Sequence, residues 1–360
     1  MKKILIISSV FVLVVITLWF GSLRTEIIDE INIVTAIGFD RAEEGKIRGT
    51  CVIPVFKADQ SVENEQFTEE SYLAKEVINI LQKKSADPLV TGGIRAGLYS
   101  EKLARDGIIE YVDALQRDAS IGSKMYMGVV EGETTELLSQ TLGNLGTGNY
   151  IATLIEHNTK NRDLPESILH TFMFRYFAQG MDPYLPMLKL EGNKVRMTGI
   201  GIFREDKLVD KISEADMFFF KALVESFGAG SYTLNLKERD EYAAIKRIKS
   251  TRTINVEESA AGTTVSIKVY LEGILSEYSG RKAEIDVVNL IVKEMEEIIE
   301  ERSYALIKRF QEKGTDPVGI GFSAEGAIRD FDPTKWKDDY GKLKVDIEAE
   351  VKLTETGVIE

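Results

Sequence analysis

Apolar and polar positions alternate along the chain with two periods, one typical of strands and one typical of helices. Residues 31–40 and 46–56 are rich in β-branched side chains and flank the turn-prone stretch RAEEG, so they predict a β-hairpin. Pro54 suggests either that the second strand lies at a sheet edge or that the proline itself lies near the end of this strand. Apolar residues then recur at helical spacing, which predicts an amphipathic helix packed on the hairpin. The apolar positions of this helix are Leu73, Val77, Ile78 and Leu81.

Strands and helices continue to alternate after this point. A short helix is expected over 100–107, begun by a serine and ended by a glycine, and a second helix follows over 108–115. A strand and a helix repeat the scheme over 125–138. This alternation favours an α/β domain over residues 24–190, with the stretch LEGNK as its boundary. Whether these residues form one domain or two stays open.

The second half, residues 191–360, predicts an α+β domain. A strand, a turn and another strand fit residues 195–213. Two long alternating runs, at 243–257 and 263–277, suit a pair of strands. The strictly alternating stretch LKVDIEAEVKL predicts a last strand that ends at Gly357.

The clearest helical pattern of the chain covers residues 283–313. Its apolar stripe is continuous, the carboxylates of KEMEEIIEER are expected on the solvent face, and Gly314 can supply the left-handed residue that ends a helix. The apolar stretch DMFFFKALV comes earlier in this half. We interpret it as core, with a ligand pocket or a partner-docking surface as the alternative.

The N-terminal residues 4–23 form a nearly uninterrupted apolar run. A helix of that length rises about 30 Å, enough to cross the core of a bilayer. The lysines before the run favour a cytoplasmic N-terminus, so the rest of the chain is expected on the outer side. Cleavage at the glycine or serine that ends the run would place Trp19 or Phe20 where a small residue is needed. We therefore expect residues 1–23 to be an uncleaved membrane anchor rather than a removed signal peptide.

The composition narrows the classes of function. Of 360 residues, 44% are hydrophobic and 29% are charged, which is typical of a globular protein. The net charge of −13 argues against a general nucleic-acid binder, because such a protein needs a cationic face. The single cysteine, Cys51, excludes an intrachain disulfide and a cysteine-based zinc site. Its apolar neighbours indicate a buried and unreactive thiol.

Residue types that carry catalysis are scarce. The chain has two histidines, His157 and His170, and no HExxH or EF-hand pattern. The stretch GFSAEG around Ser323 has one residue too many for a nucleophile elbow and follows both histidines, so it predicts a turn. Ser279 and Lys282 have the spacing of some acyl enzymes, but they lie in a connection between a strand and a helix.

The glycine-rich stretch GNLGTGN, residues 143–149, resembles a phosphate-binding loop only superficially. It lacks the lysine and hydroxyl residue that close a P-loop and does not follow a strand, so it predicts a mobile surface loop. The residues therefore predict no enzyme, with no catalytic, cofactor-binding or metal-binding side chains and no cofactor.

Several ordered segments are similar to the Ger(x)C subunits of spore germinant receptors, a family known from endospore-forming bacteria. GSLRTEIIDEINIVTAIGFD resembles the Gly-Cys-Trp-Asp end of the family's signal and the strand that follows it, without a gap. Ser22 then falls on the lipidated cysteine. Further similar segments, which extend the resemblance over nearly the whole chain, are GGIRAGLYSEKLARDGIIEYVDALQRD, LPMLKL, TGIGIFREDKLVDKIS and IKRFQEKGTDPVGIGFSAEGAIRDFDPTKW.

The resemblance implies a non-catalytic, membrane-held subunit that lies outside the inner spore membrane and is needed for germination signalling. It implies two integral membrane partners, a channel-like A subunit and a transporter-like B subunit that senses amino acids or sugars. The family's lipid anchor needs the cysteine, so a chain with Ser22 would depend on its apolar helix for attachment. The family's consecutive mixed α/β domains agree with a division near residue 190.

Two other functions stay open at this point. A surface-anchored hydrolase would need two acidic residues that converge in a cleft with perturbed pKa values. A ligand-binding module would capture the nutrient itself. The sequence names neither the nutrient nor the surface that contacts partners.

Overall fold

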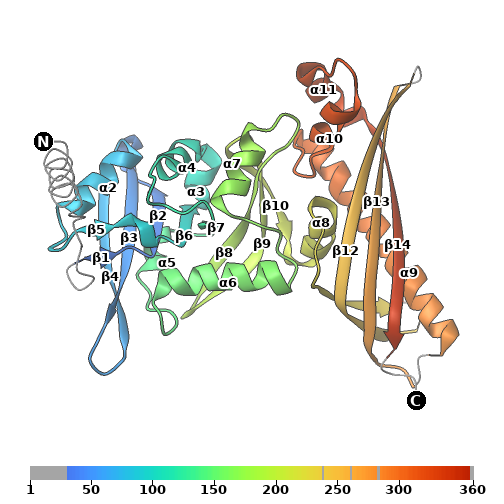
Figure 1. Cartoon of the computed structure of the whole chain (residues 1–360), viewed down its shortest axis with the longest axis horizontal. Coiled ribbons are helices and arrows are strands. Elements are labelled where there is room, and N and C mark those ends of the chain that lie inside the picture. Colours follow the sequence, from blue (N-terminus) through green and yellow to red (C-terminus); the bar gives the residue numbers. More distant parts are fainter. Residues whose placement is uncertain (1–30, 237–238, 260–261, 282–283, 357–360) are drawn as a thin grey trace, which may run out of the picture.

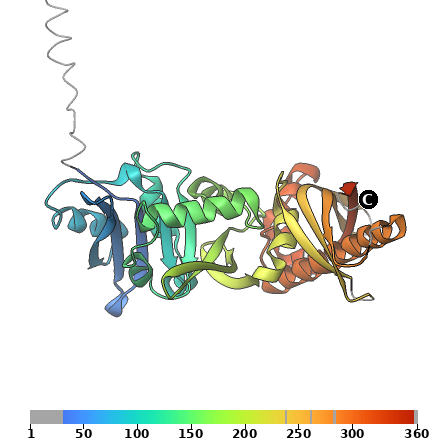
Figure 2. The ribbon, with the colours of Figure 1, turned by 90° about the horizontal axis from the view of Figure 1, so that it is seen from below.

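The computed structural model describes residues 31–236, 239–259, 262–281 and 284–356. The anchor expected over residues 1–23, Ser22 within it, and Lys282 lie outside these ranges. No helix in the described ranges is long and apolar enough to span a bilayer. Two large sheets lie one after the other along the long axis of the molecule, as Figures 1 and 2 show.

The larger sheet has eight strands in the order β10-β9-β8-β7-β6-β2-β3-β4. Its centre is parallel, because β2 pairs with β6, β6 with β7, and β7 with β8. Alternating strands and helices produce such a centre, since each helix carries the chain back to the same end of the sheet. The strands are β2 (Ala36–Arg41), β3 (Ile47–Phe56), β4 (Val62–Ser71), β6 (Ala96–Ser100), β7 (Tyr126–Val130), β8 (Tyr184–Glu191), β9 (Lys194–Arg204) and β10 (Lys207–Ser213).

Helices cover both faces of this sheet. One face packs against α2, α3, α4 and α7 around a buried cluster that contains Phe39, Leu81 and Phe172. The other face packs against α5 and α6 through Leu138 and Ile151. The helices are α2 (Ala74–Gln82), α3 (Glu101–Asp106), α4 (Ile109–Gln116), α5 (Thr134–Leu138), α6 (Thr147–Asn161) and α7 (Leu169–Phe177), and the short strands β1 (Asn32–Ile33) and β5 (Leu89–Val90) form a separate pair.

The sequence predicts much of this half correctly. The β2–β3 hairpin is present. Helix α3 begins where the Ser100 hydroxyl accepts a hydrogen bond from the amide of Leu103, and it ends at Gly107. Of the two places suggested for Pro54, the sheet edge is excluded because β3 lies between β2 and β4, and the end of a strand is confirmed. Pro54 is near the end of its strand, where its missing N–H costs little.

Other elements of this half were not predicted. Strand β4 is rich in glutamate and half exposed because it is an edge strand, so it lacks a continuous apolar pattern. The stretch 143–149 is only partly the expected surface loop. Thr147 and Gly148 already belong to α6 and are buried, and a Cβ at Gly148 would lie 2.4 Å from the Thr35 hydroxyl.

The smaller sheet has four strands in the order β11-β12-β13-β14. They are β11 (Ser231–Leu236), β12 (Glu241–Ser259), β13 (Gly262–Tyr278) and β14 (Lys344–Thr356). β12 and β13 pair antiparallel as predicted, whereas β13 and β14 are parallel. The parallel pair follows from the long helix α9 (Ile285–Lys313), which returns the chain to the end of the sheet where β13 begins.

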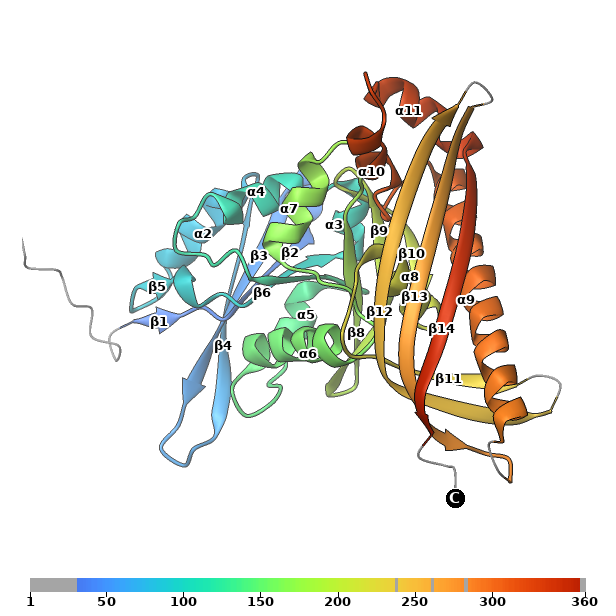
Figure 3. The ribbon, with the colours of Figure 1, turned by 45° about the vertical axis from the view of Figure 1, so that its right-hand side comes forward.

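Helix α9 packs along the smaller sheet, with α10 (Ile320–Ala327) and α11 (Pro333–Asp339) at one end (Figure 3). It ends at Gly314 with φ 62°, as predicted. Two of its glutamates do not simply face solvent. Glu296 and Glu300 accept hydrogen bonds from the backbone amides of Val351 and Ala349, so they cover the open edge of β14.

Helix α8 (Met217–Val224) joins the two sheets. Every one of its residues is buried, which confirms the core interpretation of the methionine and phenylalanine stretch. The Phe220 ring meets Tyr184 of β8 at 5.0 Å and Phe310 of α9 at 5.8 Å, both between ring centroids. Burying one such side chain contributes about 1.5–3 kcal/mol, so α8 is a main source of cohesion between the sheets.

The structure confirms the predicted mixture of helices and strands, and the strands form several sheets. The division expected at residue 190 falls inside β8, and β8 and β9 pair as neighbours in the larger sheet. The division therefore stays a prediction. The turn predicted around Ser323 is wrong, because this residue lies in α10, where its hydroxyl donates to the carbonyl of Gly319.

Candidate functional site

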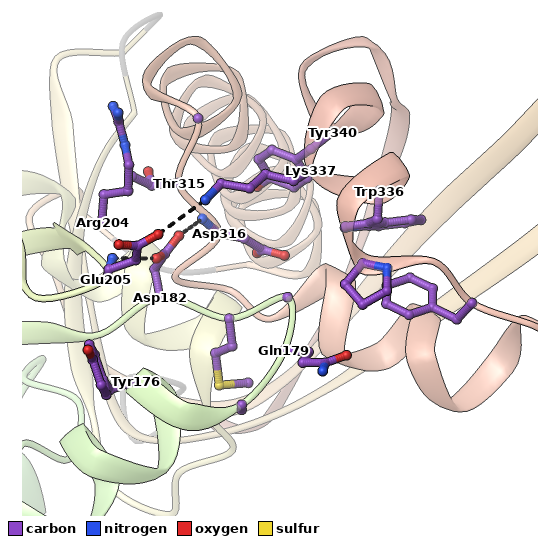
Figure 4. A pocket seen from close by; sticks show the side chains of 16 residues that line it. Tyr176, Gln179, Asp182, Arg204, Glu205, Thr315, Asp316, Trp336, Lys337 and Tyr340 are labelled. Atoms are coloured by element: carbon purple, nitrogen blue, oxygen red, sulfur yellow. Dashed lines mark hydrogen bonds and ion pairs between the residues drawn. The ribbon is translucent and has the colours of Figure 1, made fainter.

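A cavity of about 270 Å³ opens where the two sheets meet. Its lining comes from four places that are distant in sequence: the end of α7 and the segment after it, the β9–β10 turn, the segment after α9, and α11 with its flanks. Figure 4 shows these side chains around the cavity, which we name the junction cavity.

Asp182 fastens three segments of the chain to one another at this cavity. Its Oδ1 accepts a hydrogen bond from the amide of Glu205 at 3.0 Å, and its Oδ2 accepts one from the amide of Asp316 at 2.7 Å. The amide of Asp182 in turn donates to the carbonyl of Asp316 at 2.9 Å. The segment before β8 is therefore tied to the β9–β10 turn and to the segment after α9.

Asp316 holds the beginning of α10. Its Oδ1 accepts from the amides of Gly319 at 2.9 Å and Ile320 at 3.1 Å, and its Oδ2 accepts from the amide of Gly321 at 2.7 Å. The first amides of a helix have no partner within the helix, so a carboxylate placed there satisfies them. The carboxylate side chain is buried, at 6% exposure.

The pKa values of Asp182, Asp316 and Tyr340 all lie above their ordinary values. Burial raises the pKa of Asp316 to about 7, against the three amides that favour the charged form, and the nearby charge of Asp182 adds to the increase. Burial also raises the pKa of Asp182, although the amides of Glu205 and Asp316 oppose this shift. Burial and the charges of both carboxylates raise the pKa of the Tyr340 hydroxyl.

A contact between two glycines brings the segments together below the cavity. The amide of Phe322 donates to the carbonyl of Gly180 at 3.0 Å. A Cβ at Gly180 would lie 2.5 Å from the carbonyl carbon of Gly321, and Gly180 has φ 68°. Both the left-handed backbone and the close approach therefore require glycine at position 180.

The rim of the cavity is charged. Lys337 of α11 forms an ion pair with Glu205 at 3.2 Å, which Figure 4 marks across the cavity. Arg204 donates to the carbonyl of Lys313 at 2.7 Å. All three of these side chains are exposed, so their contacts link the two sheets at the surface but contribute little stability.

Three side chains that line the cavity carry a buried polar atom without a hydrogen-bond partner: the Thr315 hydroxyl, the Tyr340 hydroxyl and the Trp336 indole nitrogen. The Tyr340 hydroxyl lies close to the Asp316 carboxylate, whose negative charge helps to raise its pKa, but the geometry of the pair falls short of a full hydrogen bond. Unpartnered buried polar atoms are rare in folded proteins, so their gathering at one cavity marks a place where something can bind.

The side chains singled out in the sequence do not lie here. His157 and His170 are exposed residues of α6 and α7, and Ser279 accepts a hydrogen bond from the amide of Tyr242 in a turn. Cys51 is buried in β3, and this burial raises the pKa of its thiol to about 12. In the described ranges no group of three or more His, Cys, Asp and Glu side chains is suited to hold a metal ion.

Sequence reasoning missed the residues of the junction cavity. Asp182 and Asp316 are 134 positions apart, and each lies in a short polar segment next to a proline. The one local signal that the two segments share is an Asp-Pro pair, at 182–183 and at 316–317. Asp-Pro pairs are typical of fixed turns.

Two family models match almost the whole chain. Residues 24–190 match the spore germination protein N-terminal domain, and residues 198–357 match the family described as spore germination B3/GerAC like, C-terminal. The spore germination protein GerQC of Bacillus cereus is 29% identical over 348 residues, which cover 94% of this chain and 96% of that protein.

A second relative and a solved structure agree with these matches. The YfkR protein of Bacillus subtilis (strain 168) is 22% identical over 301 residues, which cover 79% of this chain and 77% of YfkR. The crystal structure of the GerBC protein is similar with a TM-score of 0.56 at 15% identity, over 88% of this chain and 96% of that chain. At this identity the similarity concerns the fold alone.

Proposed function

The chain belongs to the GerAC-like family of spore germination proteins, and from this premise we propose that it is the non-catalytic C-type subunit of a nutrient germinant receptor. In this role it works beside two integral membrane subunits, a channel-like A subunit and a transporter-like B subunit. It is held at the outer face of the inner spore membrane by its N-terminal apolar run, since Ser22 offers no thiol for a lipid.

The observation that carries the proposal is the match of both family models, in order, over residues 24–190 and 198–357. The similarity to GerQC covers 94% of this chain and 96% of that protein. A spore germination role follows from the family. The A and B partners, the anchoring and the lack of catalysis are the parts that we propose.

A carboxylate hydrolase is the second candidate, because Asp182 and Asp316 converge at a cavity with raised pKa values. Their hydrogen bonds favour a different role. Together the two carboxylates accept five backbone amides, so their oxygens hold three segments of the chain in place. This structural use already accounts for both carboxylates, so catalysis is not needed to explain why they lie here.

The two candidates are separated by purification of the native complex. The full chain, tagged at its C-terminus, is extracted in mild detergent from the membranes of spores that express it. We expect two polytopic membrane proteins to co-purify in comparable amounts. Recovery of the chain alone, together with release of sugar fragments from added spore cell wall, would support the hydrolase and contradict the receptor subunit.

A further inference from the structure

The floor of the junction cavity gathers hydrogen-bond acceptors from both sheets. Asp182 and Asp316 supply carboxylate oxygens, and Thr315 and Tyr340 supply hydroxyl oxygens. The two hydroxyls have no hydrogen-bond partner, and their residues are only 1% and 4% exposed. Two independent features therefore coincide here, a pair of carboxylates and a pair of unsatisfied buried hydroxyls.

The negative charge on this floor is not matched by an ion pair. In the described part of the chain neither Asp182 nor Asp316 lies within salt-bridge distance of a basic side chain. Lys337 acts on Asp182 and Arg252 acts on Asp316 only from a longer distance, and Lys337 is already paired with Glu205. The half-buried Asp182 and the buried Asp316 are neighbouring carboxylates without a paired cation, which is unfavourable, so a positive group that enters the cavity is stabilised there.

The hydrogen-bonding capacity that remains suits an ammonium group. A carboxylate offers about four acceptor positions. Asp182 uses two of them for backbone amides and Asp316 uses three. About three positions are left on the pair, and a primary ammonium has three N–H donors. The unpartnered hydroxyls of Thr315 and Tyr340 add two further acceptors beside them.

The walls of the cavity suit an organic body rather than a bare metal ion. Tyr176, Met181, Phe331 and Trp336 line it, and aromatic faces attract cations as well as apolar groups. A divalent ion needs about six oxygen ligands in close contact, whereas most carboxylate positions here are already occupied by amides. The volume of about 270 Å³ accommodates a molecule with one ring and a short chain.

We propose that the junction cavity binds a small organic ammonium compound, with its charged nitrogen between Asp182, Asp316, Thr315 and Tyr340 and its apolar part against Phe331 and Trp336. The bound molecule bridges the two sheets, because its partners come from the segments before β8, after α9 and after α11. This binding role goes beyond the proposed receptor function and does not depend on it.

The test uses the intrinsic fluorescence of Trp336. The chain has two tryptophans, so a full-length Trp19→Phe variant in detergent reports on this cavity alone. The probe is 2-phenylethylamine, and the matched control is the neutral 2-phenylethanol, each added at constant ionic strength. We expect a saturable change with the amine and a dissociation constant at least about tenfold larger for the alcohol.

Two substitutions make the test specific to the proposed nitrogen site. Thr315→Val and Tyr340→Phe remove hydroxyls that have no hydrogen-bond partner, so the fold is retained. Combined, they are expected to weaken amine binding about fivefold and to leave alcohol binding unchanged. Tyr304→Phe, at an exposed position of α9, serves as the control. Equal affinity for amine and alcohol, no saturable change, or displacement of the amine by millimolar magnesium or calcium would overturn the proposal.

Discussion

The amide of Asp316 donates a hydrogen bond to Oδ2 of Asp182 over 2.7 Å, and the amide of Asp182 returns one to the carbonyl of Asp316 over 2.9 Å. This reciprocal pair joins a segment of the larger sheet to the end of the helix that covers the smaller one. It makes the contact between the two halves of the chain specific in geometry, whereas the apolar contacts of α8 supply cohesion without direction.

Asp182→Ala is expected to destabilise the protein by about 2–4 kcal/mol. The substitution leaves the amides of Glu205 and Asp316 without an acceptor, and each unsatisfied donor costs about 1–3 kcal/mol. Urea unfolding of the full chain in detergent measures this loss. Asp338→Ala, at an exposed position of α11, is the control and is expected to change stability by less than about 0.5 kcal/mol. Equal effects of the two substitutions would contradict the role given to Asp182.

A pair of alanine substitutions separates backbone strain from close contact at Gly180. Gly180 and Gly192 have φ of 68° and 62°, so alanine is strained to a similar extent at both positions. A Cβ at Gly192 meets nothing within 4 Å, whereas one at Gly180 meets the backbone of Gly321. Gly192→Ala is expected to cost about 1 kcal/mol.

Gly180→Ala is expected to cost clearly more than Gly192→Ala and to loosen the junction between the sheets. Limited proteolysis of the folded protein detects this loosening as faster cleavage in the segments after α7 and α9. If both variants are cleaved and unfold alike, the close glycine contact does not hold the sheets together.

The contribution of Asp316 to the stability of the protein is expected to fall as the pH rises from about 4 to 7. Its pKa is about 7 in the folded state, against an ordinary value of 3.8, so the folded state binds more protons than the unfolded state between these values. Stability is then highest below the unfolded pKa and is lost as the carboxyl ionises.

The contribution of Asp316 is isolated by comparison with Asp316→Asn, which does not titrate. Urea midpoints of both proteins are measured from pH 4 to pH 8, because other carboxylates such as Glu131 have lowered pKa values and act in the opposite direction. The difference between wild type and variant is expected to change by a few kcal/mol over this range. Parallel curves would show that Asp316 keeps an ordinary pKa.

Cys51 is expected to resist thiol reagents while the protein is folded. The side chain is 2% exposed and burial raises its pKa to about 12, so almost no thiolate is present at pH 8. Ellman's reagent measures the reaction, and the same protein in concentrated urea should react completely. Rapid labelling of the folded protein would mean that β3 opens readily.

The elements that the sequence predicts are those with a strong local signal. Helix α9 has a long apolar stripe and ends at a left-handed glycine, and α3 lies between a serine cap and a glycine. Strand β4 has no such signal, because it is a largely polar edge strand in which four of the ten residues are glutamates. Its place is fixed by pairing with β3, which is a tertiary effect.

The junction cavity lay beyond sequence reasoning for a similar reason. Asp182 and Asp316 are two of many acidic residues, and their meeting depends on how β8 and α9 are positioned by the folded chain. Two carboxylates that converge in a cleft were expected only in general terms, as the mark of a hydrolase. The five backbone hydrogen bonds that they accept arise only when the backbone is folded, so no pattern of side chains in the sequence predicts them.

The most direct test of the proposed receptor function is the germination of spores that lack this chain. Spores of the deletion strain, of the wild type and of the strain complemented with the full-length gene are exposed to a panel of amino acids and sugars, and the loss of optical density is followed. The account predicts that the deletion strain fails to respond to at least one nutrient, keeps its response to others, and recovers on complementation. Unchanged germination in every nutrient would contradict it.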